Sequence, residues 1–156
     1  MTTLLTATAR DSDARAAAAR ADLVRAVRQA AAQGMTQAQI AAAIGRSQPE
    51  VSRLLRFHGT SPSAMRLRRC RAELIALVKS AGGSNVRVFG SVATGSDHEK
   101  SDIDLLFTMR RPLSLMQLGT LEQSLAELVG VTVDLVPDTA IPPVLRDRIL
   151  AEAVPL

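Results

Sequence analysis

The sequence predicts two domains, an all-α domain over residues 1–61 and an α/β domain over residues 62–156. The first observation is periodicity: apolar residues recur at helical spacing as far as Gly82-Gly83, and short strand-like runs follow. The second is charge. Residues 1–80 carry 13 Lys or Arg and 5 Asp or Glu, whereas residues 81–156 carry 6 and 10. A basic half joined to an acidic half indicates two modules with different partners.

The composition excludes several classes of protein. Hydrophobic residues make up 47% of the chain, which argues against overall disorder, and the core must be aliphatic because Trp and Tyr are absent. Cys70 is the only cysteine, so no internal disulfide forms, which fits a reducing compartment. No apolar stretch reaches about 18 residues, and charged Asp11 and Asp13 precede any apolar run. We therefore expect a cytoplasmic protein with no membrane partner.

The first half predicts three helices. An Ala-rich helix is expected over residues 13–33, ending near Gly34. Thr36 opens a second helix with Gln39 as its capping-box partner, and Ser47 opens a third with Glu50, ending near Gly59. Apolar residues of the last two helices are spaced to pack together across a turn at Gly45: Ile40, Ile44, Val51, Leu54 and Leu55.

The third of these helices has a polar face suited to double-stranded DNA. At about 100° per residue, Ser52, Arg53 and Arg56 point away from its apolar stripe, and Gln48 lies at its N-terminal edge. Gln48 can pair with adenine, and Arg53 can read guanine or bind phosphate. The segment TQAQIAAAIGRSQPEVSRLLRF resembles the helix-turn-helix of bacterial repressors, which implies an operator as partner. A plain three-helix unit that contacts proteins is the alternative.

The second half predicts three strands among four helices. Ser61-Pro62 reads as an N-cap and helix start after a Gly59-Thr60-Ser61 linker, and this helix runs to about Ala81. Strands are expected over residues 86–89, 103–107 and 131–136. A short helix follows the first strand, a helix capped by Ser114 and Gln117 precedes the third, and a last helix runs from Pro142-Pro143 to about Ala151.

Gly90 and Ser91 form a candidate anion site. They follow the first predicted strand and open the short helix, which reaches Gly95. Backbone N–H groups at a helix start, together with the Ser91 hydroxyl, suit a phosphate group. A glycine at this point allows the backbone to approach the phosphate closely.

Three aspartates form a candidate metal site. Asp102 and Asp104 alternate along a strand, so both side chains project from one face. Asp134 lies within an apolar strand, where a carboxylate needs a partner, and an adjacent strand would place it beside the pair. Hard oxygen ligands that share space with phosphate favour Mg²⁺ or Mn²⁺.

The segment VFGSVATGSDHEKSDIDLLF resembles the signature of polymerase-beta-like nucleotidyltransferases, in particular the minimal (MNT) type, and the resemblance extends over about residues 64–156. It implies an α/β fold with a small mixed sheet and ATP as nucleotide donor. It assigns Gly90 and Ser91 to triphosphate binding, Asp102 and Asp104 to metal binding, and Asp134 to metal binding and activation of the attacking hydroxyl. Minimal members often carry Arg or Tyr after Gly-Ser and Arg before the second Gly, whereas this chain has Val92 and Thr94.

The resemblance also implies a partner, because minimal nucleotidyltransferases often act as antitoxins that transfer AMP to a HEPN-type toxin. A fused DNA-binding module would then suit autorepression. Two alternatives remain open: a transferase acting on a small molecule or RNA, and a non-catalytic DNA-binding regulator that keeps the fold. Self-association into a homo-oligomer is also left open.

Overall fold

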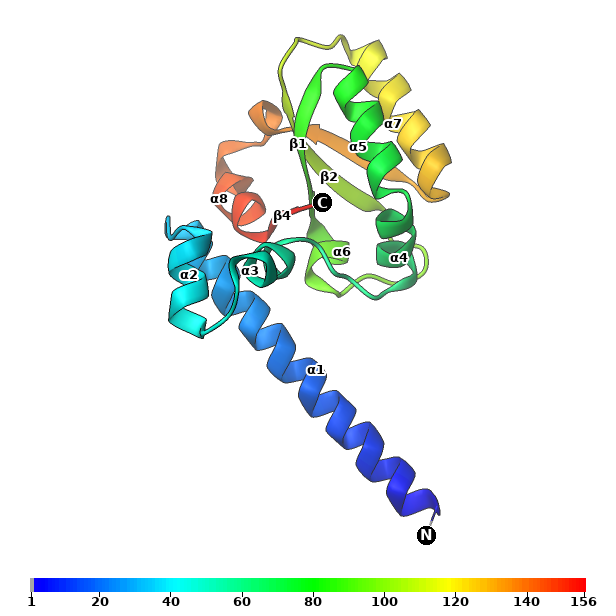
Figure 1. Ribbon diagram of the computed structural model, residues 1–156. Helices are drawn as coiled ribbons and strands as arrows, with labels where there is room; N and C mark the ends of the chain where they lie inside the picture. The colour runs from blue at the N-terminus through cyan, green and yellow to red at the C-terminus, as the bar shows by residue number, and fades with distance from the viewer. Residues whose placement is uncertain (1) are drawn as a thin grey trace. The chain divides into compact units, whose positions relative to one another are not determined.

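The computed structural model describes residues 2–156, with side chains from residue 4 onward, and the chain packs as two compact units (Figure 1). The first unit ends at Leu55 and the second begins at Arg56. The predicted domain limits, 1–61 and 62–156, differ from these units by six residues. None of the helices within the described residues is long and apolar enough to cross a membrane.

The first unit contains three helices: α1 (Thr2–Ala32), α2 (Gln37–Ile44) and α3 (Gln48–Leu55). Helix α1 begins eleven residues before the predicted start, so that prediction was wrong. The added segment holds four threonines and only two alanines, and an ion pair between Asp11 and Arg15, one turn apart, ties it to the predicted helix. Residues 4–22 of α1 are exposed, and only the last third of the helix packs on α2 and α3.

The core of the first unit confirms the predicted packing across Gly45. Five residues of three helices are buried together: Val27, Ile40, Ala41, Val51 and Leu54. The capping boxes are also present: the Thr36 hydroxyl accepts from Gln39 N–H at 3.2 Å, and the Glu50 carboxylate accepts from Ser47 N–H at 3.0 Å. Gly45 closes α2 in the left-handed conformation (φ 65°), which glycine adopts without strain.

Helix α3 ends at Leu55 rather than near Gly59, because the following residues belong to the second unit. Phe57 is buried in the second core, and its N–H donates to Pro155 O at 2.9 Å. Gly59 lies against the Phe57 ring and Ala64, where a Cβ would come within 2.6 Å of both. The predicted linker is therefore packed structure, and Arg56 lies outside α3.

The second unit contains ten elements in chain order: α4 (Pro62–Arg69), α5 (Arg71–Ser80), β1 (Gly83–Phe89), α6 (Gly90–Thr94), β2 (Ile103–Met109), α7 (Leu115–Val129), β3 (Val133–Pro137), a 3-10 helix η1 (Asp138–Ala140), α8 (Pro143–Glu152) and β4 (Val154–Pro155). The four strands form one mixed sheet in the order β3-β2-β1-β4. Strand β1 is antiparallel to β2 and β4, and β2 is parallel to β3 through the α7 crossover.

Helices cover both faces of this sheet. Alternate strand residues, such as Val88, Leu105 and Leu135, are buried in the larger core with α4, α5 and α7. Leu106 and Phe89 point to the other face, where Ile149 of α8 packs on them. Figure 1 shows α5 and α7 side by side along the sheet, with α8 apart from them. The predicted α/β class with a small mixed sheet is confirmed.

Two predicted elements differ in detail. The helix expected from residue 62 to 81 is two helices, because the backbone at Cys70 leaves helical geometry (φ −90°, ψ 5°) and its Sγ donates to Leu128 O at 3.4 Å. Strand β4 was not expected at all. It is two residues long and contains Pro155, so no alternation of apolar residues could indicate it.

Candidate active site

Three strand ends bring the predicted site residues together. Asp104 on β2 lies in register with Phe89, the last residue of β1, and with Asp134 on β3. Asp102 stands one residue before β2, and Gly90 directly follows β1. Because Leu105 faces the larger core, Asp104 and Asp134 project from the opposite face, which α8 covers only in part.

Gly90 and Asp104 are in close contact. A Cβ placed on Gly90 would lie 2.3 Å from Asp104 Oδ2, a distance that no real side chain shows. The Gly90 backbone is also left-handed (φ 70°), which favours glycine. Both facts follow from the sharp turn of the chain directly after β1, which brings the start of α6 against the Asp104 carboxylate on β2.

Helix α6 carries Ser91 directly after Gly90 and ends where predicted. Gly95 caps it in the left-handed conformation and donates its N–H to Ser91 O. The Thr94 hydroxyl lies 3.1 Å from Gly90 O and 3.2 Å from Ser91 O, so it is engaged by the backbone of its own helix. Val92 is 1% exposed and packs in the larger core. The side chains at the two positions that depart from the family pattern thus stabilise the local fold.

The electrostatics of the site centre on Asp104. Burial raises the pKa of this carboxyl group above its usual range, and the negative charges of Asp134 and Asp102 raise it further. Asp102 and Asp134 are themselves exposed. The negative charges of Asp102 and Asp134 therefore repel the charged form of Asp104, which is also the least hydrated of the three carboxylates.

The side chains of the predicted metal site do not converge on one point in this structure. Within the part of the chain that the structure describes, no three His, Cys, Asp or Glu side chains converge closely enough to hold a metal ion. The donor chemistry does fit, since carboxylate oxygens are the ligands of Mg²⁺ and Mn²⁺ and a dication offsets the repulsion around Asp104. The exposed side chains of Asp102 and Asp134 have room to turn.

Two further carboxylates of the second unit were not singled out from the sequence. Glu122 on α7 accepts a hydrogen bond from the Leu135 N–H at 2.9 Å, next to Asp134 on the edge strand. Asp97, in the loop between α6 and β2, has both carboxylate oxygens buried with no hydrogen-bond partner among the described residues. Asp97 lies within the VFGSVATGSDHEKSDIDLLF segment, but at none of the positions to which the resemblance assigns a role, and Glu122 lies outside it. Only the tertiary fold reveals the surroundings of these two residues.

Three of the four residues predicted to contact DNA lie on α3, and the fourth, Arg56, does not. Gln48 and Arg53 are exposed on α3, and Ser52 is half-buried between them. The Arg53 Nε donates to Pro49 O at 3.3 Å. Bonds from the Ser47 backbone and hydroxyl lower the pKa of Glu50, which lies 3.6 Å from Arg46. Arg56 is exposed but belongs to the second unit.

Comparison with known proteins finds relatives of the second unit. The profile of the nucleotidyltransferase domain family matches residues 67–156. A Methanocaldococcus jannaschii protein named "Putative protein adenylyltransferase MJ0435" is 36% identical over 90 residues, 58% of this chain and 97% of that protein. Protein adenylyltransferase MntA of Thermococcus cleftensis is 34% identical over 73 residues, 47% of this chain and 74% of that protein. A solved structure described as a minimal nucleotidyltransferase is 38% identical with a TM-score of 0.53, covering 62% of this chain and 97% of that one.

Proposed function

The chain belongs to the nucleotidyltransferase family. From that premise we propose that its second unit transfers AMP from ATP to a hydroxyl group of a protein: the hydroxyl bonds to the α-phosphorus, and the bond to the β-phosphate breaks with release of pyrophosphate. The observation that carries the proposal is the position of Asp104, which lies in register with Asp134 and in contact with Gly90. Asp104 lies where negative charge must be neutralised. Gly90 lies at the proposed phosphate site, and Asp134 lies where the acceptor hydroxyl would approach.

Each site residue has a role that its position supports. Gly90 lacks a side chain, so the backbone at the start of α6 can approach the triphosphate, and the Ser91 hydroxyl can donate to it. Asp102 and Asp104 would hold the metal, Mg²⁺ or Mn²⁺, which when bound supplies positive charge to the phosphate oxygens. Asp134 is exposed beside them and can accept the proton of the attacking hydroxyl.

A protein acceptor is supported by the names of two relatives, both protein adenylyltransferases. The sequence resemblance adds a HEPN-type toxin as the acceptor, which would make this chain its antitoxin. A transferase acting on a small molecule or RNA, and a regulator without catalysis, are the alternatives. Identification of the labelled product separates the first of these from a protein acceptor.

The test is label transfer from ATP that carries the label on its α-phosphate. In an extract of the source cells with added Mg²⁺, the wild-type chain should label a protein, and the Asp104→Ala variant should not. Asp147→Ala, an exposed substitution on α8, serves as the matched control and should transfer normally. Undiminished labelling by a folded Asp104→Ala variant, or labelling of RNA alone, would refute the proposal.

For the first unit we propose DNA binding in a helix-turn-helix arrangement of α2 and α3. The supporting observation is that α3 packs Val51 and Leu54 into the unit's core while Gln48 and Arg53 stay exposed. Duplex DNA from upstream of its own gene should bind, and an equally long unrelated duplex should bind more weakly. Equal affinity for the two duplexes would mean that the first unit binds DNA through its positive charge alone, without recognising a sequence.

A further inference from the structure

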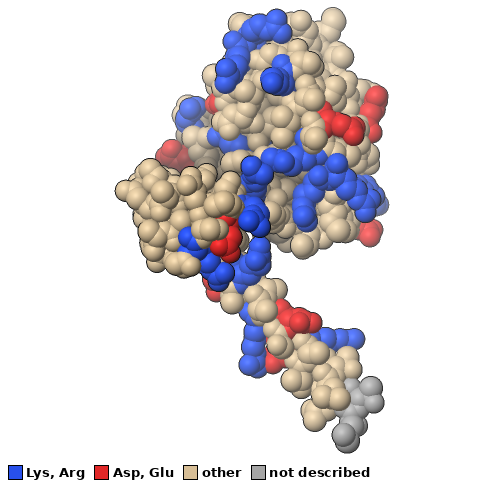
Figure 2. All heavy atoms as spheres, in the orientation of Figure 1, with Lys and Arg blue, Asp and Glu red and all other residues tan. Residues whose placement is uncertain are grey.

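The end of the sheet opposite the aspartates carries a basic pocket. At this end β1 begins and β2 ends. A cavity of about 590 Å³ lies beside the turn at residues 81–82, between α5 and β1. Three cationic residues line it, Lys79, Arg110 and Arg111, together with Gly82 to Val86 and Ile75. We call this cavity the bulge pocket. Figure 2 shows Lys and Arg atoms gathered at the top of the second unit, where Figure 1 places this turn.

The three cations are not neutralised by the protein. Among the described residues, none of them forms an ion pair with Asp or Glu, and no acidic residue lines the pocket. The Arg110 side chain donates to the neutral Ser84 hydroxyl, at 2.9 Å, and not to a carboxylate. Helix α5 ends here, and its terminal dipole offsets about half of one charge. More than two positive charges therefore remain around one cavity, at the opposite end of the sheet from three carboxylates.

The backbone around the bulge pocket is irregular. The pairing of β1 with β2 shifts register between Ser84 and Arg87, and Asn85 within this shift is left-handed (φ 53°). The Arg111 guanidinium lies against Gly82, where a Cβ would come within 2.6 Å of Nε. Bulges and residues in such conformations are frequent beside binding sites. Here the irregularity sets a hydroxyl, an amide and three cations around one space.

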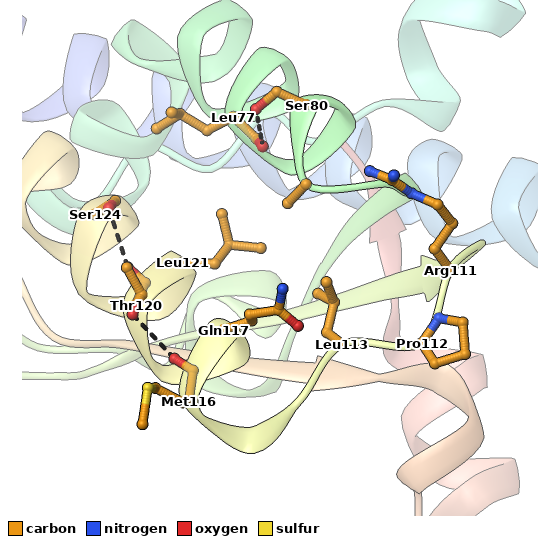
Figure 3. A pocket seen from close by; sticks show the side chains of 11 residues that line it. Leu77, Ser80, Arg111, Pro112, Leu113, Met116, Gln117, Thr120, Leu121 and Ser124 are labelled. Atoms are coloured by element: carbon orange, nitrogen blue, oxygen red, sulfur yellow. Dashed lines mark hydrogen bonds between the residues drawn. The ribbon is translucent and has the colours of Figure 1, made fainter.

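A second cavity of about 590 Å³ shares one lining residue, Arg111, with the first. This helix groove runs between α5 and α7, with Leu77, Leu113 and Leu121 among its apolar lining. Figure 3 shows the Arg111 side chain reaching from its loop toward the end of α5. The Thr120 and Ser124 hydroxyls donate to the α7 backbone, so they offer acceptors to a ligand, and the Gln117 amide NH₂ group offers a donor.

We propose that these two cavities, which share Arg111, together bind a nucleoside monophosphate, separately from the site at Asp104. The phosphate lies in the bulge pocket against Lys79, Arg110 and Arg111, and the nucleoside enters the helix groove. Each cavity lies within the range of about 300–1,000 Å³ that small-ligand sites occupy. Charge-assisted hydrogen bonds to the guanidinium groups fit a phosphate, and a mostly apolar wall with few hydrogen-bonding groups fits a base and ribose.

The test is a titration of the ¹⁵N-labelled full chain with AMP and, separately, with inorganic phosphate, followed by NMR without divalent cations. Both should shift the amide signals of residues 82–85 and 110–111 saturably. AMP should also shift those of residues 113–124 and bind about tenfold more tightly, because the nucleoside adds apolar contact. Replacing Arg110 and Arg111 with Glu should weaken AMP binding about tenfold or more. The matched control, Arg69→Glu on the exposed side of α4, should bind as the wild type does.

Three outcomes would overturn the proposal. Shifts confined to Gly90 and Ser91 would mean that AMP binds only at the site already described. Equal affinity for AMP and phosphate would mean that the nucleoside does not bind in the helix groove. Equal weakening by Arg69→Glu would reduce the effect to general charge. None of these depends on transfer activity, so failure here and failure of the proposed catalysis are distinguishable.

Discussion

Gly90 and Asp104 lie so close together that no side chain fits between them: a Cβ on Gly90 would stand 2.3 Å from Asp104 Oδ2. The two residues are 14 positions apart in sequence, and the pairing of β1 with β2 brings them together. The start of α6 and the carboxylate of the central strand therefore form one rigid unit. A change at either residue acts on both the proposed phosphate site and the proposed metal site.

We predict that Gly90→Ala abolishes nucleotide transfer and destabilises the fold. The substitution costs about 1–2 kcal/mol for the left-handed backbone alone, and displacement of the carboxylate adds to this. Gly95→Ala is the matched control, because Gly95 has a similar φ of 77° but nothing within 4 Å of an added Cβ. It should show the backbone cost alone and retain transfer. Equal losses of activity would assign the effect to backbone strain rather than to the contact.

We predict that Asp104→Asn raises stability at neutral pH while removing transfer. Burial and two neighbouring carboxylates raise the pKa of Asp104, so its charged form is disfavoured in the folded state. The folded protein thus binds this proton more tightly than the unfolded chain, and wild-type stability falls as pH rises through the raised pKa. The gain for Asn should be a few tenths to about 1 kcal/mol, since the group is only half-buried and solvent screens it.

Urea denaturation at several pH values tests this prediction. The difference between Asp104→Asn and the wild type should be greatest at neutral pH. It should disappear below the unfolded-state pKa of about 3.9, where Asp104 is protonated in both states. Asp147→Asn, an exposed change on α8 at a residue that is not among the charges raising the pKa of Asp104, should follow the wild type throughout. A neutral-pH loss of stability in the Asp104 variant would show that its carboxylate is held by partners rather than repelled.

Much of this site was predictable because its signals are local. The alternation of Asp102 and Asp104 and the Gly90-Ser91 turn at a strand end each depend on a few consecutive residues. Capping boxes at Thr36 and Ser114 are equally local and were confirmed. The role of Val92 was not predictable, because its burial depends on a core assembled from distant elements.

The ends of elements were less predictable, and for the same reason. Leu55 ends α3 because Phe57 packs in another unit and bonds to Pro155, about a hundred residues later. Residues 4–22 of α1 carry no stripe of buried residues, so apolar spacing could not reveal that the helix continues there. Tertiary contacts decide the end of α3, and neither limit is marked by a periodic pattern.

We predict that Glu122→Ala destabilises the edge strand β3, whereas Glu122→Gln does so much less. The Glu122 carboxylate accepts from the Leu135 N–H at 2.9 Å, and an unpaired N–H in this half-buried position costs about 1–3 kcal/mol. Gln retains an acceptor oxygen of similar reach. Hydrogen exchange at the Leu135 amide measures the effect directly and should accelerate in the Ala variant. Glu127→Ala, an exposed change on the same helix, is the control, and a matching acceleration there would refute the role of Glu122.

The last prediction concerns Arg53 and the proposed DNA contact of α3. If Arg53 reads a base, Arg53→Ala should weaken operator binding by about 1–3 kcal/mol and relax preference at one position of the site. If it binds phosphate instead, the loss should be uniform across sequences, and the dependence of affinity on salt should become shallower by about one phosphate contact. Arg10→Ala removes the same charge from the exposed part of α1 and serves as the control. Fluorescence anisotropy over a range of salt concentrations, on operator and scrambled duplexes, separates these cases. Binding by Arg53→Ala that equals wild-type binding on both duplexes and at every salt concentration would contradict both possibilities. The alternative, a three-helix unit whose α3 contacts a protein, would then be favoured.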